Sequence, residues 1–182
     1  MRRYIYFVFL LCCAVNLLLT SCVRQKYVVM DMVHHNPGEA MTESKFLDPS
    51  FLKKNEYGAK VFFLFEAAQF GIDWKSFDPS LFPDTTEAGR WVAEKAEIIH
   101  KKYDAAKKED LQVYCMLDML VLPSLLVEKH RTELTNEQGK LDISKPYTQL
   151  CIRELMKEMF ETFPQLDGLV IRTGETYLHD AP

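Results

Sequence analysis

Four apolar segments, separated by long gaps, constrain the fold of this chain more than any other feature of its sequence. They begin near residues 27, 60, 111 and 167. The segments "KVFFLF", "LQVYCML" and "DGLVIR" are nearly continuous apolar runs, which is typical of strands buried on both faces of a parallel sheet. Every gap is long enough to hold a crossover helix. The sequence therefore predicts an α/β fold built from parallel βα repeats.

The gaps between these segments carry helical patterns. Residues 48–58 start with Asp-Pro and end with Gly, which predicts a short helix. Residues 84–108 begin with a capping-box pattern and repeat apolar residues at three-to-four spacing. Residues 146–164 show the same spacing between two prolines, and "PSLLVEKHRTEL" predicts an extra helix before them. An apolar face along each long helix indicates packing against the sheet.

Two parallel folds fit this pattern, the doubly wound sheet and the (βα)8 barrel. A dinucleotide-binding sheet requires G-x-G-x-x-G after the first strand, where "HHNPGE" offers one glycine. We interpret residues 27–182 as half of a TIM barrel, incomplete and truncated after about four strands, so that the C-terminal half of the barrel is a missing partner. The alternative is a compact four-stranded domain that closes its own edges.

The first 26 residues predict export and lipid attachment. Arg2 and Arg3 precede an apolar stretch over residues 4–19, which is too short for a membrane-spanning helix, and "LLTSC" follows. This pattern resembles a bacterial lipoprotein signal peptide over residues 1–21, with Cys22 as the lipidated residue and residues 22–26 as a tether. The alternative is an uncleaved anchor or a buried N-terminal helix. We therefore expect a membrane-anchored protein of the cell envelope.

Charge and cysteine content narrow the possible partners. Loss of the two leader arginines would take the formal net charge from −4 to −6, which argues against a nucleic-acid partner. Cys115 and Cys151 fall in an apolar strand and on an apolar helix face, and we expect both to be core residues. Their spacing fits no metal-binding or redox motif.

Polar residues follow each predicted strand, at the edge where parallel β/α proteins bind ligands. The residues at these strand ends are His34, His35 and Asn36, then Glu66, then Asp118, and finally Arg172 and Glu175. We predict that they gather at one rim of the sheet. Glu175 is a candidate general acid if burial raises its pKa, whereas contact with Arg172 would keep it ionised.

The layout resembles the (βα)8-barrel glycoside hydrolases over about residues 27–182. The resemblance rests on "LDGLVIRTGE" with Glu175 at the end of the fourth strand, on "HHNPGE", and on the aromatic loop that contains Trp74. It implies a glycan substrate, Glu175 as the catalytic acid, and no cofactor or metal. The other strand-end residues, together with Trp74 and Tyr177, would bind substrate, with the aromatic faces stacking on sugar rings. Alternatively, the aromatic loop is a hydrophobic plug.

Two other functions remain open. A metal-dependent barrel hydrolase could draw its ligands from His34, His35, Glu66, Asp118, Glu175, His179 and Asp180. Adjacent histidines argue against it, because neighbouring side chains on a strand point to opposite faces. The other candidate is a lipid-anchored glycan-binding protein without catalytic activity.

Overall fold

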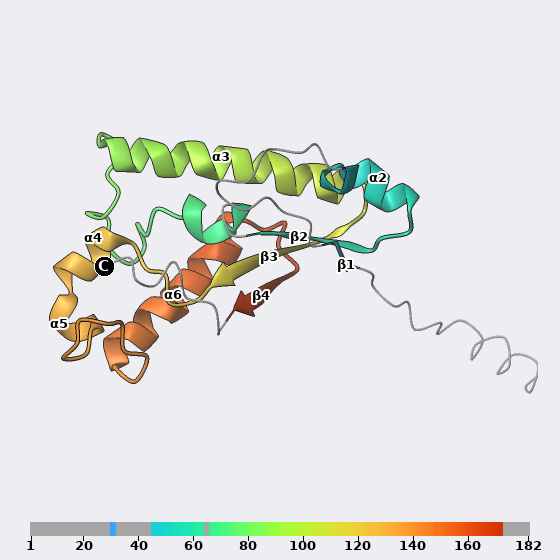
Figure 1. Cartoon of the computed structure of the whole chain (residues 1–182). Coiled ribbons are helices and arrows are strands. Elements are labelled where there is room, and N and C mark those ends of the chain that lie inside the picture. Colours follow the sequence, from blue (N-terminus) through green and yellow to red (C-terminus); the bar gives the residue numbers. More distant parts are fainter. Residues whose placement is uncertain (1–29, 32–44, 64–65, 173–182) are drawn as a thin grey trace, which may run out of the picture.

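The computed structural model describes residues 30–31, 45–63 and 66–172 of the 182-residue chain (Figure 1). These residues form a mixed α/β fold around a small parallel sheet. Its strands are β1 (Met30–Asp31), β2 (Ala59–Phe62), β3 (Gln112–Asp118) and β4 (Gly168–Arg172). The order across the sheet is β1-β2-β3-β4, and each neighbouring pair is parallel. The prediction of an α/β fold with parallel strands is confirmed.

Helices fill the connections between the strands. The two long helices are α3 (Glu87–Lys108), between β2 and β3, and α6 (Pro146–Thr162), between β3 and β4. Shorter helical elements are η1 (Lys45–Leu47), α2 (Pro49–Lys54), η3 (Ala68–Gly71), α4 (Ser124–Lys129) and α5 (Arg131–Leu134). The extra helix predicted before α6 is therefore present as two short helices, α4 and α5.

Local side chains determine where the helices begin. Asp48 caps α2 by accepting a hydrogen bond from the backbone N–H of Ser50 at 2.9 Å, as its sequence pattern predicts. Helix α3 begins slightly later than the capping pattern at residue 84 indicates. Its N-cap is Thr86, whose hydroxyl accepts from the N–H of Gly89 at 3.0 Å and donates to the carbonyl of Pro83 at 2.7 Å. The threonine satisfies an orphan amide of the first turn.

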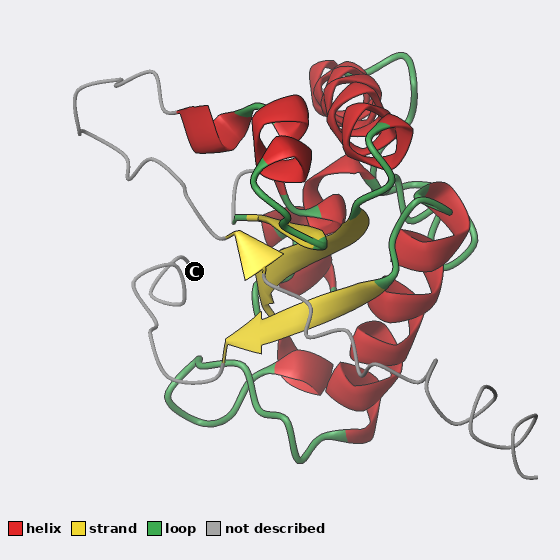
Figure 2. Ribbon diagram, turned by 90° about the vertical axis from the view of Figure 1, so that its right-hand side faces the viewer, coloured by secondary structure: helices red, strands yellow, loops and turns green. Residues whose placement is uncertain are grey.

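The main core lies between the sheet and the long helices. Val113, Cys115 and Leu117 alternate along β3 and are buried in this core. Ile99 and Tyr103 of α3 and Leu155 and Met159 of α6 belong to the same core. Both helices therefore cover the same face of the sheet, as Figure 2 also shows. Burial of each large side chain stabilises the fold by about 1.5–3 kcal/mol.

The other face of the sheet carries the alternate residues. Tyr114, Met116 and Asp118 of β3 lie beside Gly168, Val170 and Arg172 of β4 in the strand register. A Cβ atom at Gly168 would lie 2.7 Å from the Tyr114 ring, so glycine is the residue that lets this ring lie across β4.

The two cysteines of the described region are core residues, as expected. Cys115 and Cys151 are both buried and free. Burial raises the pKa of the Cys115 thiol, and it raises that of Cys151 to about 11. Both thiols are therefore protonated at neutral pH, which makes them poor nucleophiles and poor metal ligands. None of the helices in the described ranges combines the length and hydropathy that a membrane span needs.

Candidate functional site

Asp118 and Arg172 meet at the carboxyl ends of two neighbouring strands. They are paired in the register of β3 and β4. The guanidinium of Arg172 donates from Nε to Oδ1 of Asp118 at 2.7 Å and from Nη2 to Oδ2 at 3.0 Å. The arrangement is the bidentate fork that gives arginine and carboxylate their strongest contact. The predicted gathering of polar strand ends is therefore confirmed for this pair.

The two side chains of the pair differ in their exposure to solvent. The Asp118 side chain is fully buried, whereas that of Arg172 is 15% exposed. The Arg172 guanidinium carbon also lies 5.9 Å from the centre of the Phe63 ring, within range of a cation–π contact. Asp118, predicted to bind substrate, has no surface with which to touch one. It positions Arg172 instead, because both of its carboxylate oxygens accept from the guanidinium.

Glu66 does not join this pair in the way the sequence predicts. Its carboxylate forms an ion pair with Lys102 of α3, and its backbone carbonyl accepts from the Tyr103 hydroxyl at 2.9 Å. The side chain is thus directed towards the helix layer. The physical reason is the long, amphipathic α3, which packs over the end of β2 and places a lysine within reach. In this structure Glu66 makes a contact between loop and helix, and its substrate-binding role stays a prediction.

Trp74 was predicted to stack on a sugar, but its ring is only 1% exposed. It packs against Phe77 with ring centres 6.0 Å apart and belongs to the core cluster. The backbone explains the difference, since Trp74 has a φ of 58° and this left-handed turn directs the side chain inwards. The aromatic loop is therefore a hydrophobic plug at this residue.

Several predicted residues lie outside the described ranges and stay predictions. They are Cys22, His34, His35, Asn36, Glu175 and Tyr177, with His179 and Asp180 of the alternative metal site. Within the described ranges, no group of three or more His, Cys, Asp or Glu side chains is arranged to hold a metal. Of the predicted ligands, Glu66 and Asp118 are described, and each is ion-paired.

The loops that follow β2 and β3, together with α3 and α6, line an open cavity of about 220 Å³. It is lined by Gln69, Phe70, Ile72, Trp74, Phe82, Trp91, Val92, Val121, Leu122, Pro123 and Leu155. Trp91, at the start of α3, is 48% exposed. Trp91 is not among the predicted site residues; the sequence signal for it is a large aromatic residue among charged neighbours in the first turns of a helix.

Gln69 is the polar residue of this cavity, and its amide is unusual. Neither Oε1 nor Nε2 has a hydrogen-bond partner, although both atoms are buried. A buried amide without partners costs about 1–3 kcal/mol per missing contact. Such a group in a folded protein needs an explanation.

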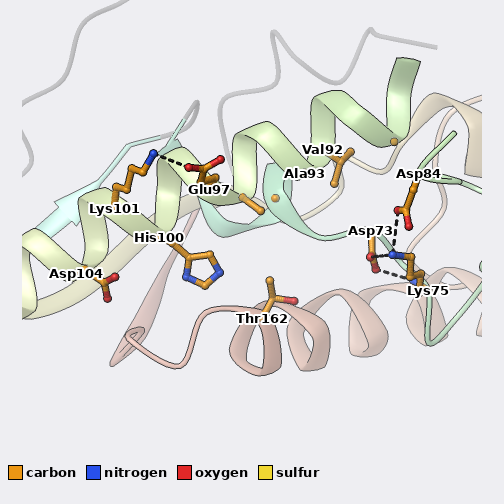
Figure 3. Close-up of a pocket in the computed structure, with 13 residues that line it drawn as sticks. Asp73, Lys75, Asp84, Val92, Ala93, Glu97, His100, Lys101, Asp104 and Thr162 are labelled. Atoms are coloured by element: carbon orange, nitrogen blue, oxygen red, sulfur yellow. Dashed lines mark hydrogen bonds and ion pairs between the residues drawn. The ribbon is translucent and has the colours of Figure 1, made fainter. Parts of the chain in front are cut away.

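A larger groove of about 470 Å³ runs beside α3, with Thr162 of α6 on its other side (Figure 3). Its charged groups pair with one another. Lys75 contacts Asp73 at 2.9 Å and Asp84 at 3.1 Å, and Lys101 contacts Glu97 at 2.6 Å. These pairs join the two lysines to three of the four acidic residues that line the groove, and the groove lies along the helix layer rather than at the strand ends. We therefore regard the strand-end region as the better candidate site.

Comparisons of the chain with protein-family models, with curated proteins and with solved structures found no match.

Proposed function

We propose that this chain is the N-terminal half of a (βα)8-barrel protein that binds and cleaves glycans at the cell envelope. The observation that carries the proposal is the Asp118–Arg172 pair. It holds a guanidinium at the carboxyl ends of two parallel strands, where barrel enzymes have their ligand sites. In this proposal Glu175, three residues further along the chain, is the general acid.

The order of the strands supports the barrel. A doubly wound sheet changes direction at a switch point and has helices on both faces. Here the described strands follow one another in chain order, and α3 and α6 cover the same face. Successive βα units arranged in this way are the building pattern of a barrel wall. The second carboxylate that glycoside cleavage needs would come from a strand beyond β4.

Arg172 indicates the class of glycan. A guanidinium favours anionic partners, and it carries five N–H donors, more than the two that Asp118 accepts here. Asp118 holds the guanidinium from the buried side, so its orientation is set before a ligand arrives. We therefore propose a polysaccharide that carries acidic sugars as the substrate.

Binding is tested on the full chain by affinity electrophoresis in gels that contain polygalacturonate, glucuronoxylan or starch. We expect retardation by an acidic polymer and none by starch. Arg172→Lys keeps the charge but loses the fork, so retardation should weaken by about tenfold. Arg131→Lys, a change at an exposed arginine, is the matched control. No retardation of the wild-type chain in either acidic gel would refute the proposed substrate class.

Cleavage is tested separately, by measuring the reducing ends that are released from any polymer that binds. The protein used is the complete barrel, in which the proposed later strands follow β4. Glu175→Gln should abolish release while leaving binding intact, and Glu97→Gln on the exposed side of α3 should change neither. Binding without cleavage would assign the protein to the non-catalytic, glycan-binding alternative.

Membrane anchoring through Cys22 is the remaining part of the proposal. Its support is the signal-peptide pattern of residues 1–21. Labelled palmitate should be incorporated by the wild-type protein and not by Cys22→Ser, which should also leave the membrane fraction. Cys151→Ser, at a buried cysteine, is the control for the loss of a thiol. Palmitate labelling of the Cys22→Ser protein would refute the lipid attachment site.

A further inference from the structure

The cavity beside Gln69 lies beyond the carboxyl ends of two strands. Gln69 and Phe70 belong to the connection that follows β2, and Val121 and Leu122 to the one that follows β3. Ligands of parallel β/α proteins bind at this edge of the sheet. Arg172 is not among the residues that line the cavity, so this is a separate place from the Asp118–Arg172 pair.

The Gln69 side chain is a hydrogen-bonding group without a partner. In the described ranges, Gln69 is the residue whose buried side chain lacks partners at both its donor and its acceptor atom. Both amide atoms are covered by protein in this conformation. Rotation of the side chain towards the cavity would break no hydrogen bond, because the amide makes none. A ligand that offers a donor and an acceptor side by side would satisfy the whole amide.

Backbone strain occurs at the same cavity. Trp74 is a bulky residue with a φ of 58°, a conformation that side chains of this size rarely adopt. Trp74 is also one of the residues that line the cavity. Strained residues of this kind cluster at ligand sites, where the surrounding structure holds them in place. The strain and the unpaired amide are independent features of one site.

Trp91 is the exposed aromatic residue of the cavity. It is 48% exposed, and the Nζ of Lys95 lies 5.6 Å from the centre of its ring. Apolar side chains and Gln69 make up the rest of the lining, with no charged side chain among the lining residues. The walls therefore suit a neutral molecule with an apolar face and a polar edge.

We propose that this cavity binds one neutral pyranose ring of a glycan. The C–H face of the sugar would lie against the aromatic wall, with Trp91 at the entrance. One sugar hydroxyl would donate to Oε1 of Gln69, and its neighbour would accept from Nε2. The cavity of about 220 Å³ is smaller than the range of about 300–1,000 Å³ typical of drug-sized ligands, so it holds a single ring.

Other small ligands fit the lining less well. An acyl chain or a plain aromatic ring would leave the Gln69 amide unpaired, and a charged ligand would meet no countercharge among the lining residues. The choice of a sugar among neutral polar ligands rests on the proposed glycan function. The Gln69 cavity would then be an accessory site that holds a neutral residue of a chain whose acidic residue is bound at Arg172.

The test uses the full chain with methyl β-D-xylopyranoside and methyl β-D-glucopyranoside as probes and p-cresol as the aromatic control. Ligand-observed saturation-transfer NMR measures binding, and the intrinsic fluorescence of the wild-type chain is followed as well, since its two tryptophans, Trp74 and Trp91, both line the cavity. We expect at least one glycoside to bind and to change the tryptophan fluorescence. Gln69→Met and Trp91→Ala should each weaken binding by about tenfold. Ile98→Ala, at another exposed apolar residue of α3, should leave it unchanged.

A stability measurement separates a binding role of Gln69 from a structural one. Gln69→Met keeps the size of the side chain and removes an unpaired amide, so its melting temperature should equal or exceed that of the wild type. A lower melting temperature, equal binding by Gln69→Met, or binding of p-cresol in place of both glycosides would each overturn the inference. If acidic polymers bind through Arg172 while the methyl glycosides do not bind, this inference fails alone; if neither binds, both proposals fail.

Discussion

Arg172 donates from two nitrogens to the two carboxylate oxygens of Asp118, which joins the last residues of β4 and β3 side by side. The carboxyl ends of these strands are thus linked by side chains as well as by the backbone ladder. The pair combines a fully buried carboxylate with a guanidinium that is 15% exposed. Loss of either partner would leave a charge in a place from which water is largely excluded.

Asp118→Ala should therefore lower the free energy of unfolding by about 3–5 kcal/mol, measured by urea denaturation. Glu137→Ala, at an exposed carboxylate, should change it by less than about 0.5 kcal/mol. The double variant Asp118→Leu/Arg172→Met should recover part of the loss, because it leaves no unpaired charge. A loss below about 1 kcal/mol in the single variant would contradict the buried pair.

Glu158 of α6 should make the stability of the fold depend on pH with a sign opposite to that of most carboxylates. Its side chain is 5% exposed and accepts a hydrogen bond from Ser76. Burial raises the pKa of this carboxyl above its ordinary 4.5, a rise that Ser76 opposes and the charge of Asp73 reinforces. Between pH 4.5 and the raised value the folded state holds more protons than the unfolded state. Stability from this group is therefore highest at low pH and falls as pH rises through the folded-state pKa.

Glu158→Gln should remove this slope and unfold at a urea concentration equal to or above that of the wild type at pH 7. Urea unfolding at a series of pH values from about 4 to 8, which begins below the ordinary pKa of 4.5, measures it. Glu161→Gln, at an exposed position of the same helix, serves as the control and should keep the wild-type slope. If Glu158→Gln and wild type show parallel pH profiles, Glu158 does not titrate in this window.

Asp78 should make the stability of the fold depend on pH in the direction that is usual for a carboxylate. Its carboxylate accepts from Lys129 at 2.5 Å, and this contact, with hydrogen bonds from Ser80, lowers its pKa from 3.8 to about 2. The resulting stability is present above pH 3.8 and is lost as pH falls through about 2. Lys129→Met should reduce this loss, by no more than about 1 kcal/mol for a contact near the surface. Thermal melts between pH 2 and 5 measure it, with Lys140→Met as the control; equal acid sensitivity of the two variants would argue against the contact.

Gly89, in the first turn of α3, is a helix position at which alanine should be less stable than glycine. Alanine normally stabilises a helix by about 1 kcal/mol relative to glycine. A Cβ atom at Gly89, however, would lie 2.1 Å from the carbonyl oxygen of Pro83, which is backbone and cannot turn aside. Gly89→Ala should therefore lower the melting temperature, by an amount that corresponds to about 1–3 kcal/mol. Ala105→Gly, at an exposed position of α3, gives the ordinary propensity effect for comparison. A stabilised Gly89→Ala protein would show that the turn at Pro83 moves easily.

The sequence predicts the strands and long helices well because their signals are local. The continuous apolar runs predict β2, β3 and β4, and the spacing along α3 and α6 requires one apolar face. The expectation that the strands are buried on both faces is wrong for β4, which is only partly buried, with Ile171 44% exposed. The edge at which Asp118 and Arg172 meet follows from the same logic, since parallel strands end at a common edge.

The partners within the site depend on information that is not local. A contact between Arg172 and Glu175 can be considered from the sequence, because the two residues are three positions apart. The contact of Arg172 with Asp118 depends instead on the register between β3 and β4. Trp74 belongs to an aromatic loop in the sequence, but its left-handed backbone decides that the ring is buried. Trp91 is exposed because the rotation of α3 places its neighbour Val92, and not Trp91, on the buried face of the helix. Register, backbone handedness and helix rotation are all fixed by tertiary packing.

The chain-order sheet has a consequence for how this protein is assembled. In the described sheet each strand after β1 pairs with the strand that precedes it in the chain, so no strand depends on a later one to fill a gap between earlier strands. A chain that emerges from its N-terminal end can therefore extend the sheet one βα unit at a time. In the proposed exported protein, each newly delivered unit would cover the edge left open by the last one, which shortens the time that any strand edge is exposed to other chains.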